Sequence, residues 1–305
     1  MSTKTKRQQL NHRTNASAAT TTKPISKTNT SKKHYTRPGV EAAAQLVQLH
    51  PISEHVQSWD KAFAKYDDMI KAKGGSKLVK LDKQMNDIAK CWQTAKESSP
   101  SLTKEELLDI IIGWKFTIGK PRNALQPLLN SNSQESVRIA TKLAFEAADE
   151  ILYNDTRGKY TGKITSAMNR ICDELKGVGP ATASAILCLY RPDIFAFMHD
   201  EVIECLYDGK RGYTLKIYLA VNDKCREISN ELNMASDNDD DDESTKWTAC
   251  KVGKALWAVA IMSAIGYESG LSSIFDSFDS IPACVTNEEN DNLPSKSTKK
   301  RAKKG

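Results

Sequence analysis

A glycine-containing segment between two helical stretches is the part of the sequence that points most directly to chemistry. Residues 175–183 read Leu-Lys-Gly-Val-Gly-Pro-Ala-Thr-Ala. Gly177 and Gly179 can adopt positive φ at little steric cost, and Pro180 suits the first position of a following helix. We expect such a turn to present backbone N–H groups and the positive end of a helix dipole to a phosphate. The alternative is a plain helix–helix corner, in which Val178 and the alanines serve only packing.

The segment resembles the helix-hairpin-helix motif, and residues 175–203 resemble the helix-hairpin-helix DNA glycosylase superfamily. In that family an aspartate at the mouth of the active-site cleft follows the hairpin, and Asp200 stands at a matching spacing. The resemblance implies a target nucleotide flipped into a cleft between two helical halves. Asp200 would then stabilise the cationic sugar as the base departs, or orient the attacking water. The residues that would hold the phosphate of one DNA strand are Gly177, Val178, Gly179, Ala181 and Thr182.

Two departures from the family pattern bear on the reaction. Members that cleave the DNA backbone through a Schiff base carry a lysine two residues after the second glycine. This chain has Ala181 there, so we expect no lyase activity. The aspartate is commonly followed by a Thr-His or Gly-Asn pair, whereas Asp200 is followed by Glu201 and preceded by His199. Glu201 could raise the pKa of its neighbour or cap the helix, and we regard His199 and Glu201 as accessory site candidates.

The stretch from Trp114 to Arg122 has two interpretations. An aromatic side chain interleaved with cations could stack on a base and neutralise phosphates across the cleft from the hairpin, through Trp114, Lys120 and Arg122. The same residues also fit a helix C-terminus, with Gly119 as the cap, cations near the negative dipole end and Pro121 as the stop. The two interpretations are compatible with each other.

The elements around these residues read as helices. Apolar residues recur at helical spacing in several windows; one of them, Ile164, Met168, Ile171 and Leu175, predicts a helix that runs up to Gly177. Thr103 with Glu106 forms a capping-box pattern ahead of the almost wholly apolar stretch 107–118. Ser133 is expected to open another helix. No stretch alternates strictly between apolar and polar residues in the manner of a strand. We therefore predict one all-α, DNA-glycosylase-like domain over residues 39–283, with an acidic disordered insert at 236–245.

The two ends of the chain are basic. Residues 1–38 carry nine Lys/Arg and no Asp/Glu, and residues 284–305 include six positive charges between Lys296 and Lys304. Both are expected to be disordered, and the second matches a nuclear localisation signal. A mitochondrial transit peptide at the first is an alternative. The whole chain has a net charge of only +6, and the acidic run at 237–243 carries six negative charges, so the remaining folded body between the tails is close to neutral. Any DNA binding must therefore come from the hairpin, from a local basic patch or from the tails.

The sequence predicts no metal site and no cofactor. The seven cysteines are scattered, without Cys-x-x-Cys pairs or zinc-type spacing, and the acidic run at 237–243 lacks the pattern of an EF-hand loop. No apolar run is long enough for a membrane span, so we expect no membrane association.

Together these features predict a nuclear DNA-binding protein with a DNA-glycosylase-like fold that acts as a monofunctional base-excision glycosylase. One alternative is a catalytically inactive helix-hairpin-helix module that binds DNA or a protein. Another is an all-α partner-binding protein with basic tails. The sequence names no protein partner.

Overall fold

The helical patterns of the sequence produce helices throughout the part of the chain that the computed structural model describes. The described residues are 39–49, 52–94, 100–152, 155–207, 209–235 and 246–275. Their regular secondary structure is entirely helical, so the prediction of an all-α fold is confirmed. The predicted disordered tails, 1–38 and 284–305, and the acidic insert 236–245 lie outside the described residues.

Twelve α-helices are described along the chain. Their bounds are α1 Val40–Gln48, α2 Val56–Ala64, α3 Tyr66–Thr94, α4 Gly113–Ile118, α5 Gln126–Asn130, α6 Gln134–Asp149, α7 Arg157–Cys172, α8 Pro180–Tyr190, α9 Asp200–Leu206, α10 Leu215–Ala235, α11 Ala249–Ala264 and α12 Glu268–Phe275. Shorter 3-10 segments occur at η1 Ile52–His55 and η3 Asn123–Leu125, and a π-helical segment, η2 Glu106–Ile112, runs directly into α4.

Two predicted helix starts are confirmed in atomic detail. The backbone N–H of Thr103 donates to Glu106 Oε2 at 2.8 Å, and the backbone N–H of Glu106 donates to Thr103 Oγ1 at 3.1 Å. This reciprocal pair is the expected capping box. At α6 the hydroxyl of Ser133 accepts from the N–H of Ser136 at 3.0 Å. Each of these bonds satisfies a backbone N–H that the first helical turn leaves without a partner.

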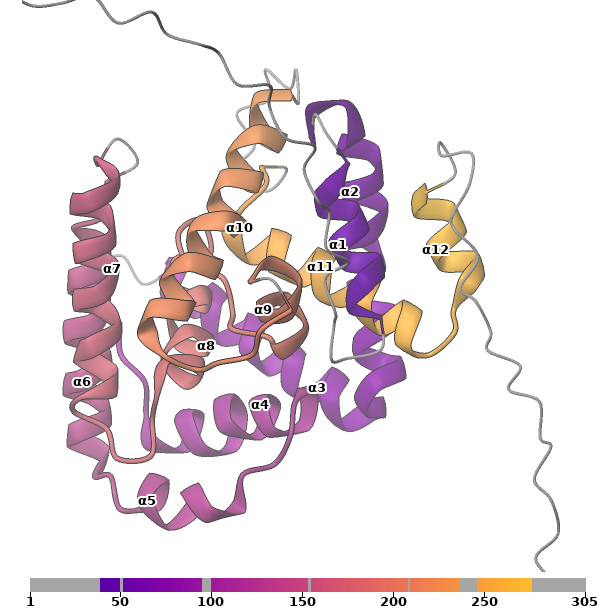
Figure 1. Ribbon diagram of the computed structural model, residues 1–305. Coiled ribbons are helices and arrows are strands. Elements are labelled where there is room, and N and C mark those ends of the chain that lie inside the picture. The colour runs from indigo at the N-terminus through magenta and orange to yellow at the C-terminus, as the bar shows by residue number, and fades with distance from the viewer. Residues whose placement is uncertain are drawn as a thin grey trace, which may run out of the picture. The chain divides into compact units, whose positions relative to one another are not determined.

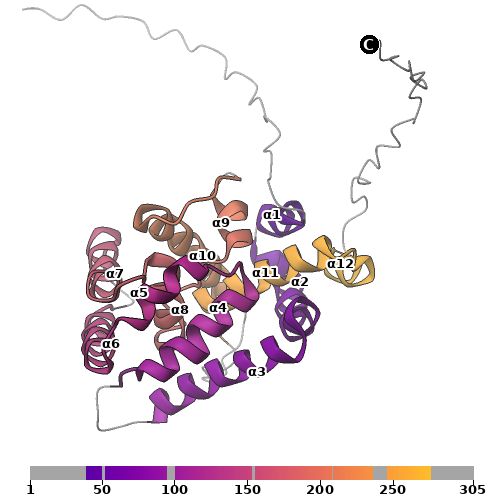
Figure 2. The ribbon, with the colours of Figure 1, turned by 90° about the horizontal axis from the view of Figure 1, so that it is seen from below.

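Helices from distant parts of the sequence pack side by side. The early helices α1 and α2 contact α11, which also contacts α10. Figure 1 shows α1, α2 and α12 at one side of the helical body and the paired α6 and α7 at the other. Viewed from below, α3 runs alongside α4 (Figure 2). The first two and the last two helices of the described chain thus pack against one another, on the side opposite α6 and α7.

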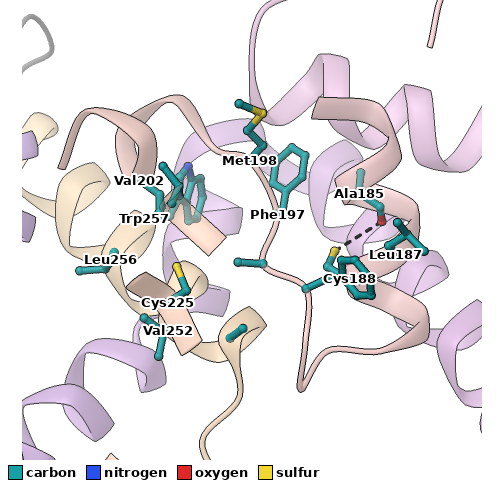
Figure 3. Packing of buried hydrophobic residues seen from close by; sticks show 14 of the residues in the cluster. Ala185, Leu187, Cys188, Phe197, Met198, Val202, Cys225, Val252, Leu256 and Trp257 are labelled. Carbon is teal, nitrogen blue, oxygen red and sulfur yellow. Dashed lines mark hydrogen bonds between the residues drawn. The ribbon is translucent and has the colours of Figure 1, made fainter. Parts of the chain in front are cut away.

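The most buried helices, α8 and α11, anchor the segment that carries Asp200. Phe197 and Met198 lie on the extended chain before α9, between side chains of α8 and α11 (Figure 3). Phe197 is 8 % exposed and Trp257 on α11 is fully buried. Burying these large apolar side chains stabilises the fold and fixes the path of the chain toward Asp200.

Candidate functional site

The glycine segment forms a turn between α7 and α8. Helix α7 ends at Cys172, earlier than the apolar pattern up to Leu175 predicts, and α8 begins at Pro180. Beyond Cys172 the chain continues as turns, although the N–H of Leu175 still makes one helix-type bond, to the carbonyl of Ile171 at 3.1 Å. Leu175 is buried in the core, which explains why its apolar periodicity extends past the helix end.

The two glycines of the turn adopt different conformations. Gly177 has φ +76°, and a Cβ there would lie 3.1 Å from Leu128 Cβ and 3.3 Å from the backbone N of Leu129. The expectation that Gly179 also adopts positive φ is wrong, because its φ is −123° and its ψ is −175°. A Cβ at Gly179 would have no atom of the described chain within 4 Å. Gly177 is therefore required by the turn itself, whereas Gly179 keeps the space in front of it open.

Three backbone N–H groups of the turn have no acceptor in the described part of the chain, those of Gly177, Gly179 and Ala181. The N–H of Thr182 differs, because it donates to the carbonyl of Gly179 at 2.9 Å. Val178, a predicted phosphate contact, is 7 % exposed and packs into the core. The turn thus presents Gly177, Gly179 and Ala181, rather than all five predicted residues, as donors for an anion.

Asp200 lies close to this turn. It is the first residue of α9 and lines a pocket of about 310 Å³ together with Gly177, Gly179, Ala181 and Thr182. We call this pocket the hairpin pocket. Two predicted accessory cations, Lys120 and Arg122, also line it, as do Lys115 and Arg211. The structure thus brings together the hairpin, Asp200 and both accessory cations, which are separated in sequence.

The charge of the hairpin pocket is positive although the folded body of the chain is close to neutral. Its lining contains four cationic side chains and two acidic ones, Asp200 and Glu201. Burial and the nearby Arg122 lower the pKa of Lys115 to about 8. Lys115 therefore remains largely protonated at neutral pH. A local excess of cations beside open backbone donors can hold an anion such as a phosphate.

The carboxylate of Asp200 is held by a neighbouring phenol. Tyr213 Oη donates to Asp200 Oδ1 at 2.8 Å. Burial, followed by the hydrogen bond to Asp200, raises the pKa of Tyr213, so the phenol stays protonated. The guanidinium of Arg122 lies 5.1 Å from the ring centroid of Tyr213. This chain of contacts orients Asp200 within the pocket.

Arg211 is positioned by a buried acid. Its Nε donates to Glu204 Oε1 at 2.6 Å, and the Glu204 side chain is fully buried. Such charge-assisted bonds restrict the direction of a guanidinium. Glu204 therefore holds Arg211 at the rim of the hairpin pocket.

The accessory candidates His199 and Trp114 are both buried. His199 is 5 % exposed, and its ring stacks on Trp257 with centroids 5.4 Å apart. Burial, with a smaller effect of Lys254, holds the pKa of His199 well below its usual value, so the ring is neutral. Trp114 does not line the hairpin pocket, because it is buried with Nε1 donating to Asp82 Oδ1 at 2.9 Å. Of the two interpretations of residues 114–122, Trp114 fits the structural one, whereas Lys120 and Arg122 face the pocket.

Three residues of this site were not anticipated from the sequence: Asn132, Arg211 and Tyr213. The side chain of Asn132 bonds the backbone of Lys176 beside the turn. Arg211 and Tyr213 lie in the connection between α9 and α10. For Arg211 and Tyr213 the only local signal was their position shortly after Asp200, as a cation and an aromatic residue. For Asn132 the local sequence carries no such signal.

The described residues contain neither a candidate metal site nor a candidate membrane span. Among them, no three or more His, Cys, Asp or Glu side chains gather in a way that could hold a metal ion. None of the helices described is both long and apolar enough to cross a bilayer.

Comparison with known proteins adds no relative. No protein-family model, curated protein sequence or solved structure matches this chain.

Proposed function

We propose that this chain is a nuclear DNA-binding protein of the helix-hairpin-helix glycosylase type, and that it releases a base from DNA without lyase activity. One observation carries the proposal: Asp200, the glycine turn and four cationic side chains line the same pocket. In sequence these groups come from separate segments. A carboxylate beside a turn that can hold a phosphate supports base release from a positioned DNA strand.

The turn would hold one DNA phosphate. The N–H groups of Gly179 and Ala181 and the N-terminal dipole of α8 supply fixed donors. The side chains of Lys120 and Arg122 supply charge at the exposed rim. Contacts of this kind position a strand without reading its sequence.

Asp200 would act on the sugar next to that phosphate. As the glycosidic bond breaks, positive charge develops on the sugar, and a fixed carboxylate stabilises it. The hydrogen bond from Tyr213 preorganises Asp200 for this role. Ala181 stands where lyases of the family carry their lysine, which supports a monofunctional reaction.

DNA affinity of the full chain, measured against salt, tests the binding step. Gly179→Val is the informative variant, because the extended backbone of Gly179 accepts a β-branched residue and the new side chain enters the open space of the pocket. We expect affinity to fall about tenfold or more, since the hydrogen bonds lost are to a charged group. Gly162→Val on the exposed face of α7 is the matched control, because a Cβ there also meets no atom. Equal affinities for the two variants would refute phosphate binding at the turn.

Base release from lesion-containing duplexes tests the catalytic step. Asp200→Asn should abolish release and leave DNA affinity nearly unchanged, because it removes charge without changing shape. A second function, a catalytically inactive DNA-binding module, is supported by the bond between Tyr213 and Asp200, which also suits a purely structural carboxylate. Hairpin-dependent binding without release on a broad lesion panel would establish that second function.

A further inference from the structure

A second pocket, of about 390 Å³, lies beside the hairpin pocket. Residues of α3, α4, α8 and α11 line it, and it shares Phe197 and His199 with the hairpin pocket. Asn86 and Lys90 at its edge are exposed, whereas Asp82 is 7 % exposed. We name it the Asp82–Lys254 pocket. Its volume falls within the range of about 300–1,000 Å³ that is typical of small-molecule sites.

The walls of the Asp82–Lys254 pocket are aromatic. The ring centroids of Trp114 and Phe197 are 4.9 Å apart, and those of Phe197 and His199 are 4.3 Å apart. Tyr66 lines another part of the wall. Because aromatic faces and edges favour stacked or edge-on contact with other rings, these walls favour a planar ligand.

Asp82 is held rigidly with part of its acceptor capacity unused. Its Oδ1 accepts from Tyr66 Oη and from Trp114 Nε1, each at 2.9 Å. Within the described part of the chain, its Oδ2 accepts only the longer bond from Asn86 Nδ2, at 3.3 Å. A carboxylate oxygen can accept two hydrogen bonds, so Oδ2 can take one more from a ligand.

Lys254 lines the same pocket, and no carboxylate of the described residues forms an ion pair with its ammonium group. Among the described residues it forms no ion pair and no hydrogen bond, and its Nζ lies 4.6 Å from the ring centroid of Tyr66. Although burial opposes its charge, Cys250 and Asp82 raise the pKa of Lys254, so the ammonium is retained at neutral pH. A mostly buried ammonium without an oxygen partner is costly, and an acceptor on a ligand would offset that cost.

The charges of Asp82 and Lys254 therefore face one pocket without pairing with each other. A ring that carries a carbonyl beside an N–H, a lactam edge, can accept from Lys254 and donate to Asp82 at once. Uracil and hypoxanthine are uncharged bases with this edge. A permanently cationic ring would instead meet the Lys254 ammonium with like charge.

We propose that the Asp82–Lys254 pocket binds uncharged lactam-type nucleobases, with the base carbonyl on Lys254 Nζ and the base N–H on Asp82 Oδ2. The part of this proposal that takes the base from DNA rests on the proposed function; the pocket chemistry itself does not. Uracil and hypoxanthine, which arise by deamination of cytosine and adenine, belong to this class together with thymine and guanine, so the substrate class would be DNA with a lactam-type base, deaminated bases included.

Binding of the free bases to the full chain tests the pocket independently of DNA. Uracil and hypoxanthine are titrated by calorimetry, with 1-methylnicotinamide as a base-sized ring of permanent positive charge. Wild type should bind both bases saturably and not the cation. Lys254→Met, which keeps most of the side chain's unbranched length, should weaken binding about tenfold or more, because a charge-assisted hydrogen bond is lost. Lys251→Met on the same helix, outside the pocket, should leave it unchanged.

A second arm distinguishes the source of the base. Duplexes with one dU in place of dC are compared with the parent duplex, using wild type and Lys254→Met. A Lys254-dependent preference for dU assigns the base to DNA, even where the free base binds too weakly to measure. The proposal is overturned when neither arm depends on Lys254 in a folded protein, or when the cationic ring binds as well as uracil. If Lys254→Met fails to fold, Lys254→Gln takes its place. Hairpin-dependent binding of the parent duplex reports separately on the proposed function.

Discussion

Asn132 holds the backbone of Lys176 through both ends of its side-chain amide. Its Nδ2 donates to the carbonyl of Lys176 at 2.9 Å, and its Oδ1 accepts from the N–H of Lys176 at 2.9 Å. The same Nδ2 lies 3.0 Å from the carbonyl of Leu129 at the end of α5. One side chain thus fastens the glycine turn to α5, next to the leucines on which Gly177 packs.

Replacing Asn132 should therefore loosen the turn. Because Asn132 is buried, Asn132→Ala leaves the backbone groups of Lys176 without their partner, and we expect the free energy of unfolding to fall by roughly 1–3 kcal/mol. Urea denaturation measures this. Asn130→Ala, at an exposed position two residues earlier, should change it by less than about 0.5 kcal/mol. Similar losses for both variants would contradict a specific clamp at Asn132.

The two glycines of the turn should respond differently to alanine. Gly177→Ala places a Cβ on a backbone of positive φ against Leu128 and Leu129, and should cost roughly 1–2 kcal/mol or more of unfolding free energy. Gly179→Ala should be close to neutral, because its backbone is extended and the Cβ meets nothing. Thermal unfolding of the two variants side by side checks this order. The reverse order would show that the turn has a different conformation in solution.

Lys115 should make DNA binding depend on pH above neutrality. Its pKa is lowered to about 8, so the cation is present at pH 7 and mostly lost at pH 9. We expect the salt slope of DNA affinity to be smaller by about one at pH 9 than at pH 7. Lys115→Arg keeps its charge across this range and should remove the change. A wild-type slope that is the same at both pH values would exclude Lys115 from phosphate contact.

His199 should make the fold less stable in mild acid. Its folded-state pKa lies well below 6.5, so the unfolded chain binds a proton that the folded chain does not. Stability is then fully present above about pH 6.5 and falls as the pH decreases below that value, by at most about 1.4 kcal/mol per pH unit. His199→Phe keeps a ring beside Trp257 and removes the titration. Denaturation between pH 7 and pH 5 should give a shallower decline for this variant, and parallel curves would contradict a neutral buried His199.

Glu204 and Arg211 should behave as a coupled pair. Arg211→Met leaves the buried Glu204 carboxylate without its main cation and should lower the free energy of unfolding by roughly 3 kcal/mol. Adding Glu204→Gln removes that buried charge, so the double variant should recover part of the loss. A double-mutant cycle by urea denaturation measures the coupling. Additive effects would show that the two side chains do not depend on each other.

Local sequence predicts much of the fold because its signals act over one or two helical turns. The Thr103–Glu106 capping box and the Ser133 cap are examples, and both appear as expected. The site is predicted less completely. The turn at residues 177–179 and the nearby Asp200 could be anticipated from glycine and proline chemistry and from the family resemblance.

Two predictions failed because tertiary packing overrides local preference. The apolar stripe continues to Leu175, but the helix ends at Cys172, since core contacts rather than helical continuation bury Leu175. Gly179 could adopt positive φ, yet the packing of the turn places it in extended backbone. A pattern of apolar residues indicates which side chains are buried, but a buried side chain can lie on a helix or on a turn.

The all-helical fold and the position of the glycine turn at residues 177–179 follow from the sequence alone, because both depend on residues that are neighbours in the chain. Only the tertiary structure decided which distant side chains meet. Asn132 reaches Lys176 across 44 positions, and Trp114 reaches Asp82 across 32. The placement of Asp82 and Lys254 in one pocket likewise depends on how α3 packs against α11. Such pairings are set by the packing of whole helices, which no short stretch of sequence contains.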